Sequence, residues 1–188
     1  MNKNITTALK EHSKSLDKID IDRINTATEL ITKSLVSGNK VFWCGNGGSA
    51  AQANHLSAEL IGGMYKDKKA PFKSICLNVD TAFISAWSND DSFDNIFVRQ
   101  LEALADSGDV LIALSTSGNS QNIINALNYA NNHNATTLAF LGYDGGKAIK
   151  IAKNHILVPS FDMQICEDIH LKIGHIIMKY LCDFKIED

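Results

Sequence analysis

Short apolar runs alternate with helical patterns along most of the chain, and this alternation constrains the fold more than any other feature. Five runs have the length and composition of buried strands: residues 40–44, 74–79, 109–114, 136–141 and 155–158. Helical patterns separate them, at residues 49–61, 81–87, 93–105, 120–132 and 146–152. Strands joined by helices form parallel sheets that are covered on both faces. The sequence therefore predicts an α/β fold, a three-layer sandwich with a central five-stranded parallel sheet flanked by helices.

Helical patterns also open and close the chain. Near its start, four apolar residues recur on one helical face: Ile24, Ala27, Ile31 and Leu35. Residues 162–184 carry a second apolar pattern of the same period. No repeat or low-complexity linker interrupts the sequence, which has only two prolines. We therefore expect one domain over residues 1–188, with an N-terminal helical region at 1–37 and an α/β core at 40–188.

The composition argues against several classes of function. A formal net charge of −3, without a basic patch, is unlike a nucleic-acid-binding protein. No apolar run approaches the roughly 18 residues that a membrane span needs. The four cysteines lie far apart in the sequence, as reduced structural thiols do. We expect a cytoplasmic protein that binds neither nucleic acid nor membrane and holds a small anionic ligand by local geometry.

Residues 44–49 form a glycine-rich loop between the first strand and the helix that follows it. Glycines let the backbone approach an oxyanion closely. The helix N-terminus adds unpaired N–H groups at the positive end of its dipole. We expect Asn46, Gly47, Gly48 and Ser49 to contact a phosphate, with Ser49 at the N-cap. A tight strand-to-helix turn without a ligand is the alternative interpretation.

The same loop fits the Gly-x-Gly-x-x-Ala form of a dinucleotide-binding fingerprint, through Gly45, Gly47 and Ala50. The match is weak, because the nearest acidic candidate for the ribose, Asp80, lies farther along the chain than the roughly twenty residues expected. A dinucleotide-dependent oxidoreductase is therefore a minor alternative, which absorbance changes on adding NAD would reveal.

A second loop, residues 115–120, follows another apolar strand and precedes another helix. Four hydroxyl groups surround its single glycine, those of Ser115, Thr116, Ser117 and Ser120. Hydroxyl and backbone N–H groups can wrap a phosphate with neutral donors, which suits a protein without a basic patch. A helix cap alone needs only one hydroxyl. Two such loops after two strands of one sheet indicate a phosphate site far more specifically than either loop alone.

Acidic and histidine side chains accompany these loops. His55 and Glu59 lie four residues apart, on one helical face. Isomerising a ketose phosphate requires a base that takes a proton from carbon and an acid that serves the carbonyl oxygen, and Glu59 and His175 are our candidates. The same side chains could instead hold zinc. Glu167 and His175 would lie about 12 Å apart along an ideal helix, so they share one ion only if their side chains converge or the helix begins irregularly.

Together these motifs resemble the sugar isomerase (SIS) domain proteins and, among them, the phosphoheptose isomerases, also called sedoheptulose 7-phosphate isomerases. The resemblance covers almost the whole chain. It rests on residues 44–49, His55 with Glu59, Asn89 with Asp90, residues 115–120, residues 144–147 and the stretch from Glu167 to His175.

The resemblance implies an aldose-ketose isomerase that converts sedoheptulose 7-phosphate to D-glycero-D-manno-heptose 7-phosphate by proton transfer through an enediol. The product would feed heptose synthesis for lipopolysaccharide or capsule. The resemblance also implies a homotetramer with active sites at subunit interfaces. One zinc ion per subunit would be held by His55, Glu59, Glu167 and His175. Glu59 and His175 match the family's proposed base and acid.

The substrate contacts implied by the resemblance come from both loops, from the end of one helix and from the closing helix: Asn46, Gly47, Gly48, Ser49, Asn89, Asp90, Ser115, Thr116, Ser117, Ser120 and Glu167. The chain departs from the family at Glu167, where relatives carry glutamine, and lacks their arginine just before it. The main alternative is a non-catalytic SIS-domain module that binds a sugar phosphate as a sensor or regulator. Retention of His55, Glu59 and His175 favours the enzyme.

Overall fold

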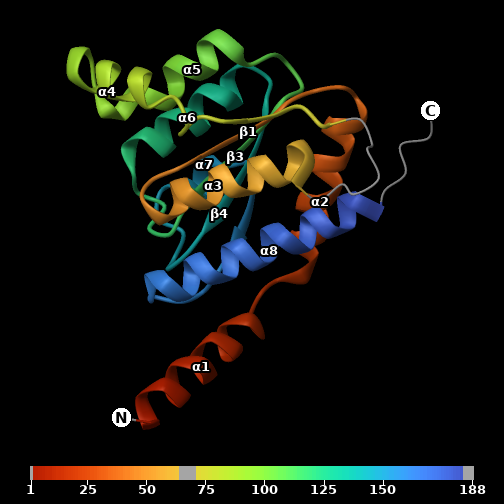
Figure 1. Ribbon diagram of the computed structural model, residues 1–188, viewed down its shortest axis with the longest axis vertical. Helices are drawn as coiled ribbons and strands as arrows, with labels where there is room; N and C mark the ends of the chain where they lie inside the picture. The colour runs from red at the N-terminus through yellow and green to blue at the C-terminus, as the bar shows by residue number, and fades with distance from the viewer. Residues whose placement is uncertain (1, 64–70, 184–188) are drawn as a thin grey trace.

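A computed structural model of the protein describes residues 2–63 and 71–183, and within them the side chains of residues 5–62 and 71–181. Five parallel strands form one central sheet, in the order β2-β1-β3-β4-β5. Their bounds are β1 Val41–Gly45, β2 Ser74–Cys76, β3 Val110–Ser115, β4 Thr136–Leu141 and β5 Asn154–Leu157. The predicted parallel α/β sandwich is confirmed (Figure 1).

Helices connect the strands and cover the sheet. They are α1 Asn2–Leu16, α2 Ile21–Val36, α3 Gly48–Ala58, α4 Thr81–Asp90, α5 Ile96–Leu104, α6 Gln121–Asn132, α7 Ala148–Ile151 and α8 Met163–Asp183. A π-helical turn, η1 Glu59–Gly63, continues α3, and a 3₁₀ turn, η2 Phe93–Asn95, precedes α5. Helix α1 stands away from the rest of the molecule (Figure 1). Its His12 reaches Asp168 of α8, with 2.9 Å between Nε2 and Oδ2.

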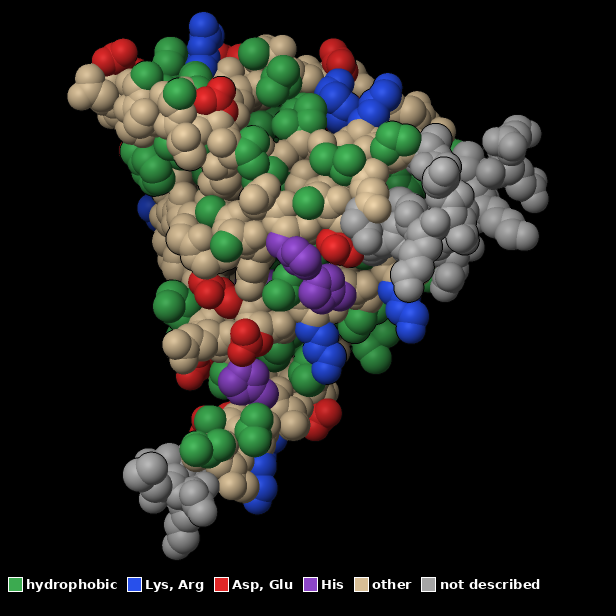
Figure 2. Space-filling view, viewed as in Figure 1, with side chains coloured by type: hydrophobic (Ala, Val, Ile, Leu, Met, Phe, Trp, Pro, Cys, Tyr) green, Lys and Arg blue, Asp and Glu red, His purple; other side chains and the backbone are tan. Residues whose placement is uncertain are grey.

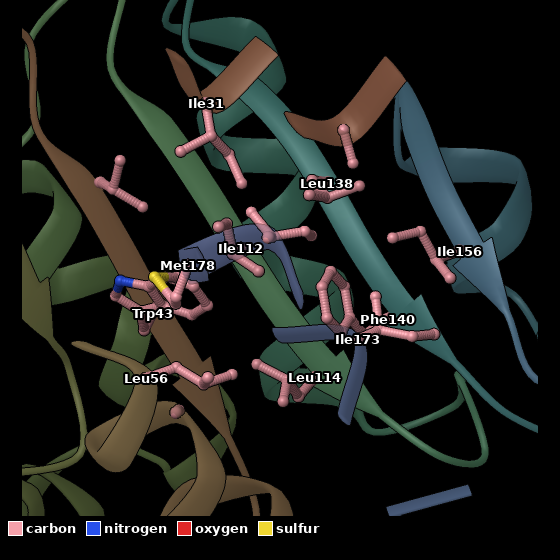
Figure 3. Packing of buried hydrophobic residues seen from close by; sticks show 14 of the residues in the cluster. Ile31, Trp43, Leu56, Ile112, Leu114, Leu138, Phe140, Ile156, Ile173 and Met178 are labelled. Carbon is pink, nitrogen blue, oxygen red and sulfur yellow. The ribbon is translucent and has the colours of Figure 1, made fainter. Parts of the chain in front are cut away.

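Two hydrophobic clusters lie on opposite faces of the sheet, because successive side chains of a strand point to opposite sides. Helices α2, α3 and α8 cover the first cluster, which includes Ile31, Trp43 and Ile173 (Figure 3). Helices α5, α6 and α7 cover the second, which includes Phe42 and Leu111. Burial on both faces explains why the strand sequences are almost continuously apolar.

The strand order reverses between β1 and β3, since β1 is followed in sequence by β2 on one side and by β3 on the other. In open α/β sheets, ligands bind at such a switch point, beyond the carboxyl ends of the strands. The two predicted phosphate loops follow β1 and β3. The fold therefore brings them to the same crevice.

Some predicted boundaries are wrong. The segment 74–79 forms a strand only at Ser74–Cys76, at the edge of the sheet. Gly47, not Ser49, is the N-cap of α3, because its φ of +57° turns the chain into the helix. The segment 146–152 is helical only at Ala148–Ile151.

Three of the four cysteines, Cys44, Cys76 and Cys166, are buried free thiols, as expected, while the side chain of Cys182 lies outside the described residues. Burial raises the pKa of each of the three thiols. No helix in the described ranges combines the length and hydropathy that crossing a bilayer requires.

Candidate active site

A hollow of about 380 Å³ opens at the switch point, between the N-terminal ends of α3, α6 and α8. Its volume suits a small ligand such as a sugar phosphate. Eleven of the described residues line it, and nine of them are ones predicted from the sequence to bind substrate: Asn46, Gly47, Gly48, Ser49, Ser115, Thr116, Ser117, Ser120 and Glu167. Leu114 and Met163 complete the lining. The two loops thus meet around one cavity, as expected.

The hydroxyl-rich loop is held in shape by glycine geometry and hydrogen bonds. Gly118 has a φ of +63°, and a β-carbon there would lie 2.6 Å from the carbonyl carbon of Gly145. The N–H of Gly118 donates to Oγ of Ser115, and the N–H of Gly142 donates to the carbonyl of Thr116. Ser120 is the N-cap of α6, yet its side chain makes no capping hydrogen bond. Its hydroxyl can therefore serve a ligand at the positive end of that helix.

An amide pair joins the loop after β1 to the first turn of α6. Asn46 and Asn122 each donate from Nδ2 to Oδ1 of the other, at 2.9 Å in both directions. Asn122 also accepts the N–H of Ile123, and its side chain is buried. Sequence reasoning missed Asn122, because nothing in the pattern of α6 distinguishes it from the other asparagines there. It ties the loop after β1 to the start of α6, directly after the hydroxyl-rich loop.

Glu167 is the one acidic or basic side chain among the described residues that line the hollow, and it lies against the N-terminus of α3. A β-carbon on Gly48 would lie 2.6 Å from Oε1 of Glu167, so the carboxylate rests against the glycine backbone. Gln52, which the sequence analysis also missed, donates from Nε2 to the carbonyl of Glu167 at 2.7 Å. A carboxylate is stabilised by the positive end of a helix dipole.

His55 and His175 meet farther along the same two helices. Their Nε2 atoms are 2.8 Å apart, and the rings cross at 84°. Close helix packing permits this contact: a β-carbon on Gly174 would lie 2.6 Å from Leu56. Helices α3 and α8 therefore run in parallel, with Gly48 opposite Glu167 and His55 opposite His175.

Glu59 follows His55 by one turn, and its backbone N–H donates to the carbonyl of His55. Figure 2 shows two histidine side chains in contact on this face, with an acidic side chain beside them. Because α8 is one regular helix, His175 is about 12 Å from Glu167 along the helix axis. Within the described residues, no three histidine, cysteine or acidic side chains gather closely enough to hold a metal ion.

Asn89 and Asp90 lie at the end of α4, outside the lining of the hollow. Both are exposed, and Nδ2 of Asn89 donates to Oδ1 of Asp90 at 2.8 Å. The chain alone therefore does not bring these two predicted substrate contacts to the others.

His170 of α8 is a structural histidine. Its Nε2 lies 3.0 Å from the carbonyl of Leu141, and its ring packs edge-on against Phe140. Burial lowers the pKa of His170 to about 4, so it is neutral at pH 7. It supports the α8 side of the hollow without exposing a proton to it.

Comparison with known proteins agrees with this geometry. The family model described as the SIS domain matches residues 6–142. The phosphoheptose isomerase of Aquifex aeolicus is 45% identical over 148 residues, which are 79% of this chain and 77% of the relative. That of Nitratiruptor is 39% identical over 94% of this chain and 96% of its own. The structure of phosphoheptose isomerase from Neisseria gonorrhoeae has a TM-score of 0.90 and 31% identity, covering 97% of this chain and 99% of that one.

Proposed function

The chain belongs to the SIS domain family and, within it, to the phosphoheptose isomerases, and on this premise we propose that it interconverts sedoheptulose 7-phosphate and D-glycero-D-manno-heptose 7-phosphate. One observation carries the proposal: a hollow lined by hydroxyl groups and a helix N-terminus shares α3 and α8 with a histidine pair and an adjacent glutamate. Such a site has a phosphate grip at one end and acid-base groups at the other.

The described residues that line the hollow include no cationic side chain, so neutral donors bind the phosphate in this proposal. Hydroxyls of the 115–120 loop and N–H groups at the start of α6 satisfy the phosphate oxygens directly. Glu167 stands across the hollow from this loop, where its carboxylate accepts hydrogen bonds from the sugar hydroxyls. The Glu167 carboxylate rests at the N-terminus of α3, and this position keeps its negative charge away from the phosphate.

The reaction moves one proton between adjacent carbons. Glu59 removes a proton from C1 of the ketose, which leaves an enediol across C1 and C2, and returns a proton to C2 to give the aldose. His175 donates a proton to the C2 oxygen as the enediol forms, and takes the proton of the C1 hydroxyl as the aldehyde forms. His55 holds His175 in place through the Nε2 contact.

Zinc is the cofactor that the resemblance implies, and the donors along α3 and α8 fit it in part. Two imidazole nitrogens suit zinc, and their separation of 2.8 Å is close to the separation of about 3.3 Å between two ligands of a tetrahedral ion. His55 and His175 would supply two nitrogen ligands, and Glu59 would join them only if its side chain moved closer, because the described residues hold no cluster of three donors. Glu167, also expected as a ligand, rests against Gly48 and is assigned to the substrate instead. When bound, zinc supplies a Lewis acid for the substrate carbonyl.

The assembly and location expected from the resemblance are part of the same proposal: a homotetramer in the cytoplasm, with interface active sites and a product used for surface heptose. Exposed apolar side chains support assembly. Ile5 and Leu9 of α1 are 64% and 67% exposed, on a helix that stands away from the core (Figure 1). Apolar surface of this kind is typical of contacts with another chain.

Proton transfer in heavy water tests the function. Incubated with sedoheptulose 7-phosphate in D₂O, the protein should place deuterium on carbon in both the aldose and the recovered ketose. Glu59→Gln should abolish incorporation while binding is retained, whereas Glu102→Gln on the surface of α5 should leave it unchanged. Binding without any exchange in the parent protein would instead identify a non-catalytic SIS-domain module.

A further inference from the structure

One aromatic side chain beside the hollow is unusually exposed. Phe161, in the turn between β5 and α8, is 80% exposed, more than any other large apolar side chain in the part of the chain that the structure describes. Leaving a phenylalanine in water forgoes about 1.5–3 kcal/mol of burial free energy. Such exposure is informative where neighbouring apolar groups extend it into a patch next to a binding site.

The turn that carries Phe161 is fixed by hydrogen bonds. Oγ of Ser160 accepts the N–H of Asp162, and Oδ1 of Asp162 accepts the N–H of Gln164 at the start of α8. The carbonyl of Ser160 accepts the N–H of Tyr143. The Phe161 ring stacks on that of Tyr143, with centroids 5.5 Å apart and planes 13° from parallel. These hydrogen bonds fix the turn, and the turn holds the Phe161 ring exposed to solvent.

This turn borders the hollow on two sides. Met163, two residues after Phe161, is 50% exposed and lines the hollow. On the other side, Gly142, which precedes Tyr143, donates its N–H to the carbonyl of Thr116 in the hydroxyl-rich loop. Met163 lines the hollow, and the stacked pair Phe161 and Tyr143 lies next to it without lining the hollow; we call these three residues the apolar rim.

The rim adds aromatic surface beside the hollow. Ligand sites usually combine a few polar groups with apolar and aromatic walls. Among the described residues that line the hollow, Leu114 and Met163 are the only large apolar side chains, and none is aromatic. A phosphate fills the polar part, but the carbon chain of a sugar also presents C–H groups that aromatic and thioether surfaces contact favourably.

We propose that the apolar rim contacts the carbon chain of the sugar phosphate and determines which sugar phosphates are accepted, with Phe161 the main specificity-determining residue. The proposal rests on the proposed isomerase function for the identity of the substrate. The contact between the rim and the sugar does not require catalysis, so binding measurements alone can test it. The rim contacts the sugar chain beyond the phosphate, and the hydroxyl-rich loop binds the phosphate.

Two ligands separate these contributions. The dissociation constant of sedoheptulose 7-phosphate, its KM and kcat, and the inhibition constant of inorganic phosphate are measured for the parent, Phe161→Ala and Phe161→Tyr. Phe161→Ala should raise the dissociation constant and KM of the sugar phosphate about 3- to 10-fold, with kcat and phosphate inhibition within about twofold of the parent. Phe161→Tyr, which keeps the stacked ring, should restore the parent values. Tyr180→Ala, which removes an exposed aromatic ring at the far end of α8, is the matched control.

Three results would overturn the proposal. Unchanged sugar-phosphate affinity in Phe161→Ala shows no contact. A parallel loss of phosphate affinity shows that the substitution disturbs the loop. A change in sedimentation coefficient shows that Phe161 packs against a second copy of the chain. If the parent binds but does not turn over sedoheptulose 7-phosphate, the isomerase assignment fails, and the comparison of dissociation constants between the parent and Phe161→Ala still decides the role of the rim.

Discussion

The Nε2 atoms of His55 and His175 lie 2.8 Å apart, although 120 positions separate the two residues in the chain. Two N–H groups cannot face each other at that distance, so one Nε2 donates a hydrogen bond to the other or both face one positive ion. The contact exists because Gly174 lets α8 approach Leu56 of α3 closely. Helix packing thus sets the geometry of the proposed acid-base site.

Metal content tests the pair as ligands. The purified protein should contain about one zinc ion per chain, and His55→Ala and His175→Ala should each lose most of it, because two nitrogen donors dominate the proposed set. Elemental analysis gives the measurement. His133→Ala, which removes a ring that stacks on Tyr129 at the end of α6, is the control and should keep its zinc. Full zinc content in both His55 and His175 variants would contradict the assignment.

The contact between Gly48 and Glu167 gives a second prediction. Gly48→Ala should displace the Glu167 carboxylate, because the new β-carbon would lie 2.6 Å from Oε1. The carboxylate ends a flexible side chain, so we expect the free energy of unfolding to change by less than about 1 kcal/mol. kcat/KM for the sugar phosphate should fall by about tenfold or more, because the substrate loses its carboxylate partner.

A double variant isolates the cause. In a Glu167→Ala background, Gly48→Ala no longer meets a carboxylate, so the second substitution should cost little further activity. Additive losses in kcat/KM would mean that Gly48→Ala acts through the loop backbone and not through Glu167.

Most of the fold followed from the sequence because local patterns specify it. The strands before both loops begin or end within one residue of their predicted bounds, since apolar runs ending in glycine- or serine-rich loops mark them clearly. The edge strand β2 is shorter than predicted, because only one neighbouring strand pairs with it. Convergence of the two loops was also predictable, since parallel strands carry their following loops to one edge.

Contacts between distant elements did not follow from local patterns, although the family resemblance placed His55, Glu167 and His175 in one site. Glu167 rests against Gly48 and His175 against His55 because of how α8 is placed along α3, and no pattern within either helix encodes that placement. The Asn46–Asn122 pair depends likewise on the spacing of β1 and β3 loops. The predicted N-cap of α3 was wrong. A left-handed backbone at Gly47 starts the helix two residues before Ser49, the residue that N-cap preferences favour.

The amide pair yields a third prediction. Asn122→Ala leaves the Asn46 amide without its reciprocal partner, so we expect a loss of about 1–3 kcal/mol in the free energy of unfolding and weaker phosphate inhibition. Urea unfolding measures the first and inhibition kinetics the second. In a double-mutant cycle with Asn46→Ala, the combined loss should be clearly smaller than the sum, and strict additivity would show that the two amides stabilise the protein independently.

His170 makes stability depend on pH. Burial lowers its pKa from 6.5 to about 4, so the unfolded chain binds a proton more readily than the folded protein between these values. Stability from this residue is complete above pH 6.5 and is lost as the pH falls toward 4, by about 3 kcal/mol in total.

His170→Gln keeps an N–H donor for the carbonyl of Leu141 but does not titrate. Urea unfolding from pH 7 to 4 should therefore give a smaller decline in unfolding free energy for His170→Gln than for the parent. Equal declines would mean that His170 is not the buried neutral group, since its removal would then leave the proton balance between folded and unfolded states unchanged.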